Sequence, residues 1–202
     1  MRNALSYFGA GIFEFGQPRE FTGTIRCDAA PLLAGKEKEY LLVGYGKNGV
    51  PAEICGATSG EVVVNGTLIE REGRDLIEVV SSTPGTAPAA TSAPSIPLGR
   101  YTLTGEVVDS KCYFGVMNPA EGRAHRACAS LCLRGGVPAV FVARDRTGAT
   151  SHLLIAGLDG KPINPSLLRW VGEAVEATGD VARQGKWLVW RIDPTSLHFA
   201  GR

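Results

Sequence analysis

Residues 60–80 and 172–192 share one sequence pattern, and this repeat constrains the fold more than any other feature. Each segment opens with Gly-Glu and carries a further glycine 13 residues later, Gly73 and Gly185, where a turn is expected. Alternating apolar residues then close each segment. A strand, a short polar turn with glycine and a second strand are typical of a β-hairpin. We therefore expect one small β module to be used twice.

Four segments follow from this repeat. Residues 1–18 form an apolar, aromatic N-terminal arm that is expected to pack on the first module or on a partner. The first module covers 19–80, and the second covers 99–202. Between them, 81–98 contains four prolines among Ala, Ser and Thr and no charged residue, which is the composition of an extended, semi-rigid linker.

The second module gives the clearer fold prediction. Runs typical of strands occupy Tyr101–Asp109, Ala139–Ala143 and His152–Ala156, and a short helix capped by Asn164 precedes the repeated hairpin. Three strands, a helix and a long hairpin resemble the OB-fold, a five-stranded Greek-key barrel. The first module follows this order more weakly. The predicted fold class is mainly β with short helices: two OB-like small barrels in tandem, the second with an inserted Cys/His helix.

Charge and hydropathy argue against two classes of protein. The 21 basic and 20 acidic residues give a net charge of +1, without the basic excess of a dedicated nucleic-acid binder. No stretch approaches 18 uninterrupted apolar residues, so no transmembrane span is predicted. Binding of single-stranded nucleic acid through a barrel face stays a weak alternative. The aromatic pair available for stacking, Trp187 and Trp190, falls on opposite faces of one strand, so at least one is expected in the core.

The segment 109–138 carries the chemistry of this chain. Within it, Asn118 as a cap, Pro119 at the first helical position and the Gly135-Gly136 pair predict a helix over 119–134. The chain has five cysteines, an odd number that fits no complete disulfide framework. They are Cys27, Cys55, Cys112, Cys128 and Cys132.

Four side chains are expected to converge in this segment. His125, Cys128 and Cys132 fall at i, i+3 and i+7 of the predicted helix, on one inward-facing stripe. Cys112, at the end of the preceding predicted strand, could meet that stripe. The set Cys112, His125, Cys128 and Cys132 offers the Cys₃His donors that suit tetrahedral Zn²⁺.

Two other interpretations of the same residues stay open. A disulfide from Cys112 to Cys128 or Cys132 would fix the helix to the barrel. Alternatively, the thiols are small buried side chains with no chemical role. A reactive thiol is a further possibility, but the arginines of the predicted helix lie opposite the cysteine stripe.

The run Gly44–Gly49 fits the G-x-G-x-x-G pattern of dinucleotide-binding loops. That function requires a helix opening at the loop within a parallel βαβ unit, and Pro51 follows almost at once. We therefore interpret the run as a turn.

Part of the insertion resembles a known pattern. The runs Gly105–Tyr113, His125–Cys132 and Gly135–Pro138 are similar to a motif in uncharacterised bacterial proteins, which tend to be membrane-attached or exported. The resemblance implies an extracytoplasmic module and no particular activity. A periplasmic or membrane-associated location is therefore favoured, with a cytoplasmic one as the alternative, since the first residues lack the pattern of a signal peptide.

Together these observations favour a non-catalytic accessory or binding protein within a larger, membrane-associated assembly. Its second module would hold a structural disulfide or a metal ion. The alternative is a thiol- or metal-dependent redox enzyme that uses Cys112, His125, Cys128 and Cys132.

Overall fold

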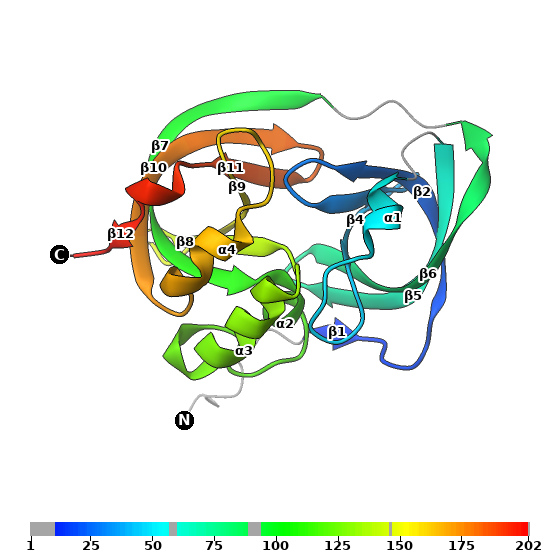
Figure 1. The fold of residues 1–202 in the computed structure, drawn as a ribbon, viewed down its shortest axis with the longest axis horizontal. Helices are drawn as coiled ribbons and strands as arrows, with labels where there is room; N and C mark the ends of the chain where they lie inside the picture. Colours follow the sequence, from blue (N-terminus) through cyan, green and yellow to red (C-terminus); the bar gives the residue numbers. More distant parts are fainter. Residues whose placement is uncertain (1–10, 57–59, 89–93, 146, 202) are drawn as a thin grey trace.

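The structure is a computed structural model and describes residues 11–56, 60–88, 94–145 and 147–201. Figure 1 shows two barrels side by side, with the N-terminal half of the chain forming one and the C-terminal half forming the other. Each barrel is closed and has five strands. The predicted fold class, mainly β with two OB-like barrels in tandem, is confirmed.

Barrel one is formed by five strands whose order closes on itself. Its elements are β1 (Ile12–Phe13), β2 (Arg19–Cys27), β3 (Pro31–Ala34), β4 (Glu39–Val43), α1 (Ala52–Gly56), β5 (Gly60–Arg71) and β6 (Arg74–Pro88). The strands pair in the order β5-β2-β3-β4-β6, and β5 pairs again with β6 to close the barrel. The β4–β6 pair is parallel, and β1 adds to the free edge of β5.

Barrel two repeats this connectivity with more helix. Its elements are β7 (Ser95–Asp109), α2 (Ser110–Phe114), α3 (Gly122–Arg134), β8 (Ala139–Arg144), β9 (Thr150–Ala156), α4 (Asn164–Leu167), the 3₁₀ turn η2 (Leu168–Trp170), β10 (Ala174–Gln184), β11 (Trp187–Arg191), the 3₁₀ turn η3 (Pro194–Ser196) and β12 (His198–Phe199). The order is β11-β9-β8-β7-β10, and β10 pairs with β11 to close it. The parallel pair is again between the third and fifth strands, β9 and β11.

The repeated hairpins have the same glycine requirements in both barrels. Gly73 and Gly185 turn the hairpins with positive φ of 72° and 60°, a conformation that glycine adopts without steric cost. Gly66 and Gly179 lie in the first arm, where an added Cβ would meet the second arm at 2.4 Å in each case. The sequence repeat is therefore a repeat of hairpin geometry.

Part of the segment that its composition predicts to be an extended linker, 81–98, pairs with the barrels; residues 89–93 lie outside the described residues. β6 continues to Pro88 and β7 begins at Ser95, so strand occupies most of 81–98. The cause is pairing: residues 81–84 lie against β5, and residues 95–97 lie against β10. Figure 1 shows the end of β6 and the start of β7 at the edge of the molecule opposite α2 and α3.

The two barrels share a hydrophobic layer. In β4, Leu42 faces the interior of barrel one, while Leu41 and Val43 face the partner barrel. In β11, Trp190 faces the interior of barrel two, while Trp187 faces barrel one. The alternation of a strand thus serves two cores at once, and both tryptophans are buried on opposite faces, as predicted.

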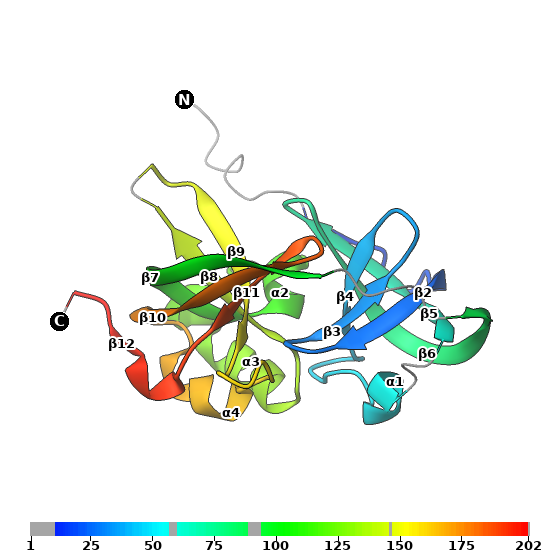
Figure 2. The same cartoon turned by 90° about the horizontal axis from the view of Figure 1, so that it is seen from above.

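Polar contacts cross the same interface. Glu39 accepts a hydrogen bond from the Lys186 backbone N–H at 2.9 Å, and Arg74 donates to the Lys186 carbonyl at 2.6 Å. Arg71 donates to the Tyr113 carbonyl at 3.0 Å. Figure 2 shows α2 at the junction between the barrels. Among the described residues, every helix is too short or too polar to span a bilayer.

Candidate metal centre

The first barrel-two strand, β7, delivers the first candidate ligand. β7 ends at Asp109, and the chain turns directly into α2, whose first turn is capped by the Asp109 carboxylate accepting from the Cys112 N–H at 2.9 Å. Cys112 therefore lies in a short helix, whereas the sequence placed it at the end of the strand. The strong cap explains the difference, because Asp109 starts a helix immediately after the ladder ends.

The helix α3 delivers the other three candidate ligands. It begins at Gly122, three residues later than the predicted start at Pro119. Glu121 is extended, Gly122 has a φ of 74°, and the Gly122 N–H donates to the Glu106 carboxylate of β7, so this segment is a turn. The later start of α3 leaves the predicted stripe inside the helix, where His125 and Cys132 are buried and Cys128 is half-buried. Arg123 and Arg126 lie on another face and pair with Glu173.

The structure brings the predicted residues together around Cys112. Its Sγ lies 4.0 Å from the Sγ of Cys128 and 4.0 Å from the Sγ of Cys132. Ligand atoms of Cys112, His125 and Cys128 all lie within 4.8 Å of one another, as do those of Asp109, Cys112 and Cys132. These Cys/His groups could hold a metal ion.

Asp109 orients the histidine. Its carboxylate is fully buried, and one oxygen lies 3.2 Å from His125 Nε2. The other oxygen accepts the cap hydrogen bond from Cys112. With Nε2 directed to Asp109, Nδ1 is the ring nitrogen left for a metal.

A lysine from the other barrel completes the cluster. Lys47 Nζ lies 2.7 Å from Cys128 Sγ, and it belongs to the loop 44–49 that follows β4. This loop packs on the end of α3: the Gly49 N–H donates to the Gly135 carbonyl at 2.7 Å. A Cβ at Gly135 would lie 2.0 Å from the Lys47 carbonyl, so only glycine fits there. The G-x-G-x-x-G run is therefore a docking turn between the barrels.

A buried lysine holds this loop in shape. Lys111 Nζ donates to the Gly44 carbonyl at 2.7 Å and to the Gly46 carbonyl at 2.6 Å. It also pairs with the buried carboxylate of Glu78 on β6. The ion pair and the two carbonyl bonds satisfy a charge that would otherwise be costly to bury. Lys111 thus fixes the loop that presents Lys47.

The contacts of the cluster alter its ionisation. The hydrogen bond with Cys112 lowers the pKa of Cys132, whereas the same bond, burial and the nearby Asp109 raise the pKa of Cys112. The hydrogen bond to Cys128 raises the pKa of Lys47, although burial acts in the opposite direction. Cys112 therefore keeps its proton in preference to Cys132, and the charged form of Lys47 is favoured beside Cys128.

The disulfide is in barrel one. Cys27 and Cys55 form it, linking the end of β2 to α1, while Cys112, Cys128 and Cys132 are free thiols. The alternative disulfide from Cys112 to Cys128 or Cys132 is not formed in this structure. Spacing alone cannot give connectivity, and the fold decided it by placing Cys55 beside the end of β2.

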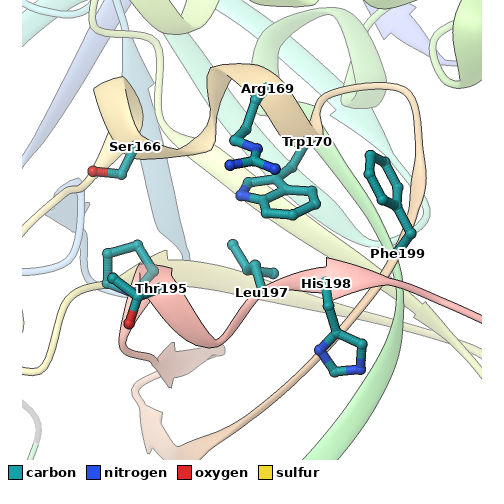
Figure 3. Close-up of a pocket in the computed structure, with 8 residues that line it drawn as sticks. Ser166, Arg169, Trp170, Thr195, Leu197, His198 and Phe199 are labelled. Atoms are coloured by element: carbon teal, nitrogen blue, oxygen red, sulfur yellow. The ribbon is translucent and has the colours of Figure 1, made fainter. Parts of the chain in front are cut away.

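One hollow lies beside the Cys/His cluster, and a second lies on the far side of barrel two. A groove of about 260 Å³ has Cys112 and Cys132 in its lining, together with the loop 44–47 and residues 115–117. Figure 3 shows another hollow, between η2 and the η3–β12 segment, in which the Arg169 guanidinium lies 4.2 Å from the centroid of the Trp170 ring. The lining of that hollow shares no residue with the Cys/His cluster.

Comparisons with family models, with curated proteins and with solved structures found no match for this chain. Function must therefore be argued from the geometry of the centre itself.

Sequence reasoning missed two members of the cluster. Asp109 carried no pattern of its own at the end of a predicted strand, although Asp is a preferred N-cap residue. Lys47 lay inside a run interpreted only as a turn. Its role depends on how the two barrels dock, which local sequence does not encode.

Proposed function

We propose that this protein is a non-catalytic accessory or binding protein whose second barrel binds one zinc ion through Cys112, His125, Cys128 and Cys132. The 4.0 Å sulfur separations around Cys112 carry the proposal. In a tetrahedral site with Zn–S bonds of about 2.3 Å, two sulfurs lie about 3.8 Å apart. The Cys112–Cys128 and Cys112–Cys132 separations are therefore close to those of a zinc site, whereas Cys132 would have to move toward His125 and Cys128 for one ion to bind all four residues.

The number of thiols supports a metal over a second disulfide. A disulfide would consume two sulfurs and strand the third, whereas a Cys₃His site uses all three together with the buried histidine. The chain already contains one disulfide, so three adjacent thiols that stay reduced need protection, which coordination supplies. The same disulfide favours an oxidising compartment such as the periplasm.

Asp109 and Lys47 are assigned outer positions. Both carboxylate oxygens of Asp109 are engaged, with Cys112 and with His125, so it orients a ligand instead of binding. Three thiolates and Zn²⁺ leave one net negative charge, which the Lys47 ammonium balances beside Cys128. Because all four inner positions come from the protein, the site is structural, and this favours a binding protein over an enzyme.

The test is the metal content of the purified chain. We expect one equivalent of zinc, and replacement by Co²⁺ should give a charge-transfer band whose intensity reports three thiolates. Cys112→Ser and Cys128→Ser should each lose the metal, whereas the double variant Cys27→Ser/Cys55→Ser should keep it. Chain that binds no zinc, or loses it in the double variant alone, contradicts the proposal.

The outer positions are tested separately. Asp109→Asn keeps the helix cap and should weaken zinc affinity by about 10-fold to 100-fold while leaving one equivalent bound. Lys47→Met should weaken affinity by about 10-fold, and Lys36→Met, an exposed lysine elsewhere in barrel one, should have no effect. An Asp109→Asn variant with one fewer thiolate or histidine signal would mean that Asp109 is itself a ligand.

A thiol redox enzyme is the second candidate, and the groove that reaches Cys112 and Cys132 is the observation in its favour. Single-stranded nucleic-acid binding is a weaker one. An affinity for single-stranded nucleic acid that falls steeply as the salt concentration rises would support that function and contradict the accessory role.

A further inference from the structure

The groove at the junction of the barrels leads from solvent to two of the three thiols. Its lining includes the side chains of Phe15, Tyr45 and Val116, which are exposed, and at its base Cys112 and Cys132. Cys112 is half-buried and Cys132 is buried, so a small molecule that enters meets Cys112 first. Cys128 is not part of this lining.

The three sulfurs are not equivalent. Cys112 stands on α2, whereas Cys128 and Cys132 stand on α3, one helical turn apart. Cys112 lies 4.0 Å from each of the other two sulfurs, so a bond from Cys112 joins different elements and avoids closing one helical turn on itself. Cys128 is held by Lys47, which gives its thiolate a partner outside the sulfur cluster.

We propose that Cys112 and Cys132 form a reversible disulfide on reaction with a small hydroperoxide, and that this reaction releases the zinc ion. The inference rests on the zinc site proposed above for its second half only. Its first half, the Cys112–Cys132 bridge, concerns the thiols themselves.

The reaction balances in two steps. The Cys112 thiol passes its proton to the Cys132 thiolate, whose sulfur lies 4.0 Å away, and the Cys112 sulfur then attacks the outer oxygen of ROOH, which forms Cys112 sulfenic acid and, after taking one proton, the alcohol ROH. The Cys132 thiolate then attacks the sulfenic sulfur, which forms the disulfide and, with a second proton, releases water. Two thiolates have lost two electrons, and the hydroperoxide has gained them.

The release of zinc follows from the ligands that remain. After the bridge forms, only His125 and the Cys128 thiolate still offer a bond to the metal, and two ligands do not hold Zn²⁺ against water. The Cys128 thiolate keeps its ion pair with Lys47. A thiol reductant reverses the bridge and restores the site.

The experiment adds one equivalent of hydrogen peroxide to purified protein and follows zinc with a metallochromic dye. We expect one zinc released per chain, a fall from three titratable thiols to one, and a Cys112–Cys132 disulfide in a peptide map beside an unchanged Cys27–Cys55. Dithiothreitol with added zinc should restore three thiols and one bound ion.

A matched pair of exposed valines tests the groove. Val116→Trp narrows it and should slow the loss of thiols by about tenfold, because access limits the rate. Val80→Trp, a similarly exposed valine on β6, should react like the parent protein. Equal rates for both variants would contradict entry through the groove.

The outcomes separate the two proposals. Zinc content before oxidation tests the zinc site alone. The peptide map tests the bridge with or without zinc, so a Cys112–Cys128 bridge, or three thiols that survive the peroxide, overturns this inference. Bridge formation in protein that never held zinc would overturn the zinc site and the release step and leave the oxidation standing.

Discussion

The two barrels fix the ends of the corresponding strands β2 and β7 to neighbouring helices in different ways. The run Phe21–Ile25 of β2 aligns with Leu103–Val107 of β7 through a shared Thr-Gly pair, so Cys27 at the end of β2 corresponds to Asp109 at the end of β7. Cys27 is linked covalently to α1 through Cys55, whereas Asp109 bonds noncovalently to His125 of α3 and caps α2. Barrel one has three residues between its first two strands, and barrel two has the whole Cys/His insertion.

This difference teaches where a repeated fold can gain chemistry. The strand order, the parallel pair between the third and fifth strands and the hairpin glycines are the same in both barrels, so they are fixed by the fold. The connection after the first strand is free to change, because it lies outside the ladder. Barrel one keeps this connection to three residues and links the end of β2 to α1 by a disulfide, whereas barrel two uses the connection to gather thiols.

The largest effect should come from removing the brace of barrel one. The disulfide closes a loop with a sequence separation of 28 residues, so Cys27→Ser/Cys55→Ser should lower the free energy of unfolding by about 3.5 kcal/mol. Denaturant unfolding measures it. An unchanged unfolding free energy would mean that the packing of Ile54 in the interior of barrel one, not the bridge, holds α1 in place.

The next effect should come from barrel two. Zinc at 100 times its Kd should raise the free energy of unfolding by about 2.7 kcal/mol and Tm by about 5–10 °C relative to chelator-treated protein. The same increment should be found in the Cys27→Ser/Cys55→Ser variant within about 0.5 kcal/mol if the two corners act independently. A larger discrepancy would show that the barrels couple them.

The hairpin glycines test whether the copies are equivalent. Gly66→Ala and Gly179→Ala each place a methyl group 2.4 Å from the opposite arm, and each should cost about 2 kcal/mol. Gly56→Ala, where an added Cβ meets nothing within 4 Å, is the control and should be neutral or stabilising. A large effect at one hairpin glycine only would break the equivalence of the two copies.

The smallest effect is a loss of folding stability at acidic pH, and it arises from a histidine at the interface between the barrels. Burial, with Arg74 and Arg144 acting in the same direction, lowers the pKa of His152 from 6.5 to about 4. The unfolded chain therefore binds more protons between these values, and stability falls as pH drops through this window. Glu72, 3.2 Å away, favours the charged ring, so about 1 kcal/mol should be lost between pH 7 and 5.

The control for this prediction is His152→Gln in the presence of a chelator, which removes the pH dependence of metal binding. Tyr113, the other polar neighbour of the ring at 3.3 Å, has a pKa raised above its usual value by burial and does not titrate in this range. A variant that keeps the full acid loss would assign it to another group.

The sequence predicted the strands and the convergence of the candidate site because both depend on local periodicity. Alternating apolar residues, turn glycines and the His125–Cys128–Cys132 stripe are set by the local sequence, and they do not depend on which segments pack against them. The Ala/Pro segment did not follow its composition, since β5 and β10 offered free ladder positions to it. The start of α3, the Cys27–Cys55 pair and the reach of Lys47 were set by contacts between distant segments.

The layer between the barrels has a consequence for dissecting the molecule. Strands such as β4 and β11 carry apolar side chains on both faces. Either half expressed alone would therefore expose a large hydrophobic surface to water. Cutting the chain between Pro88 and Ser95 should therefore yield fragments that aggregate, or that fold only when the two are mixed.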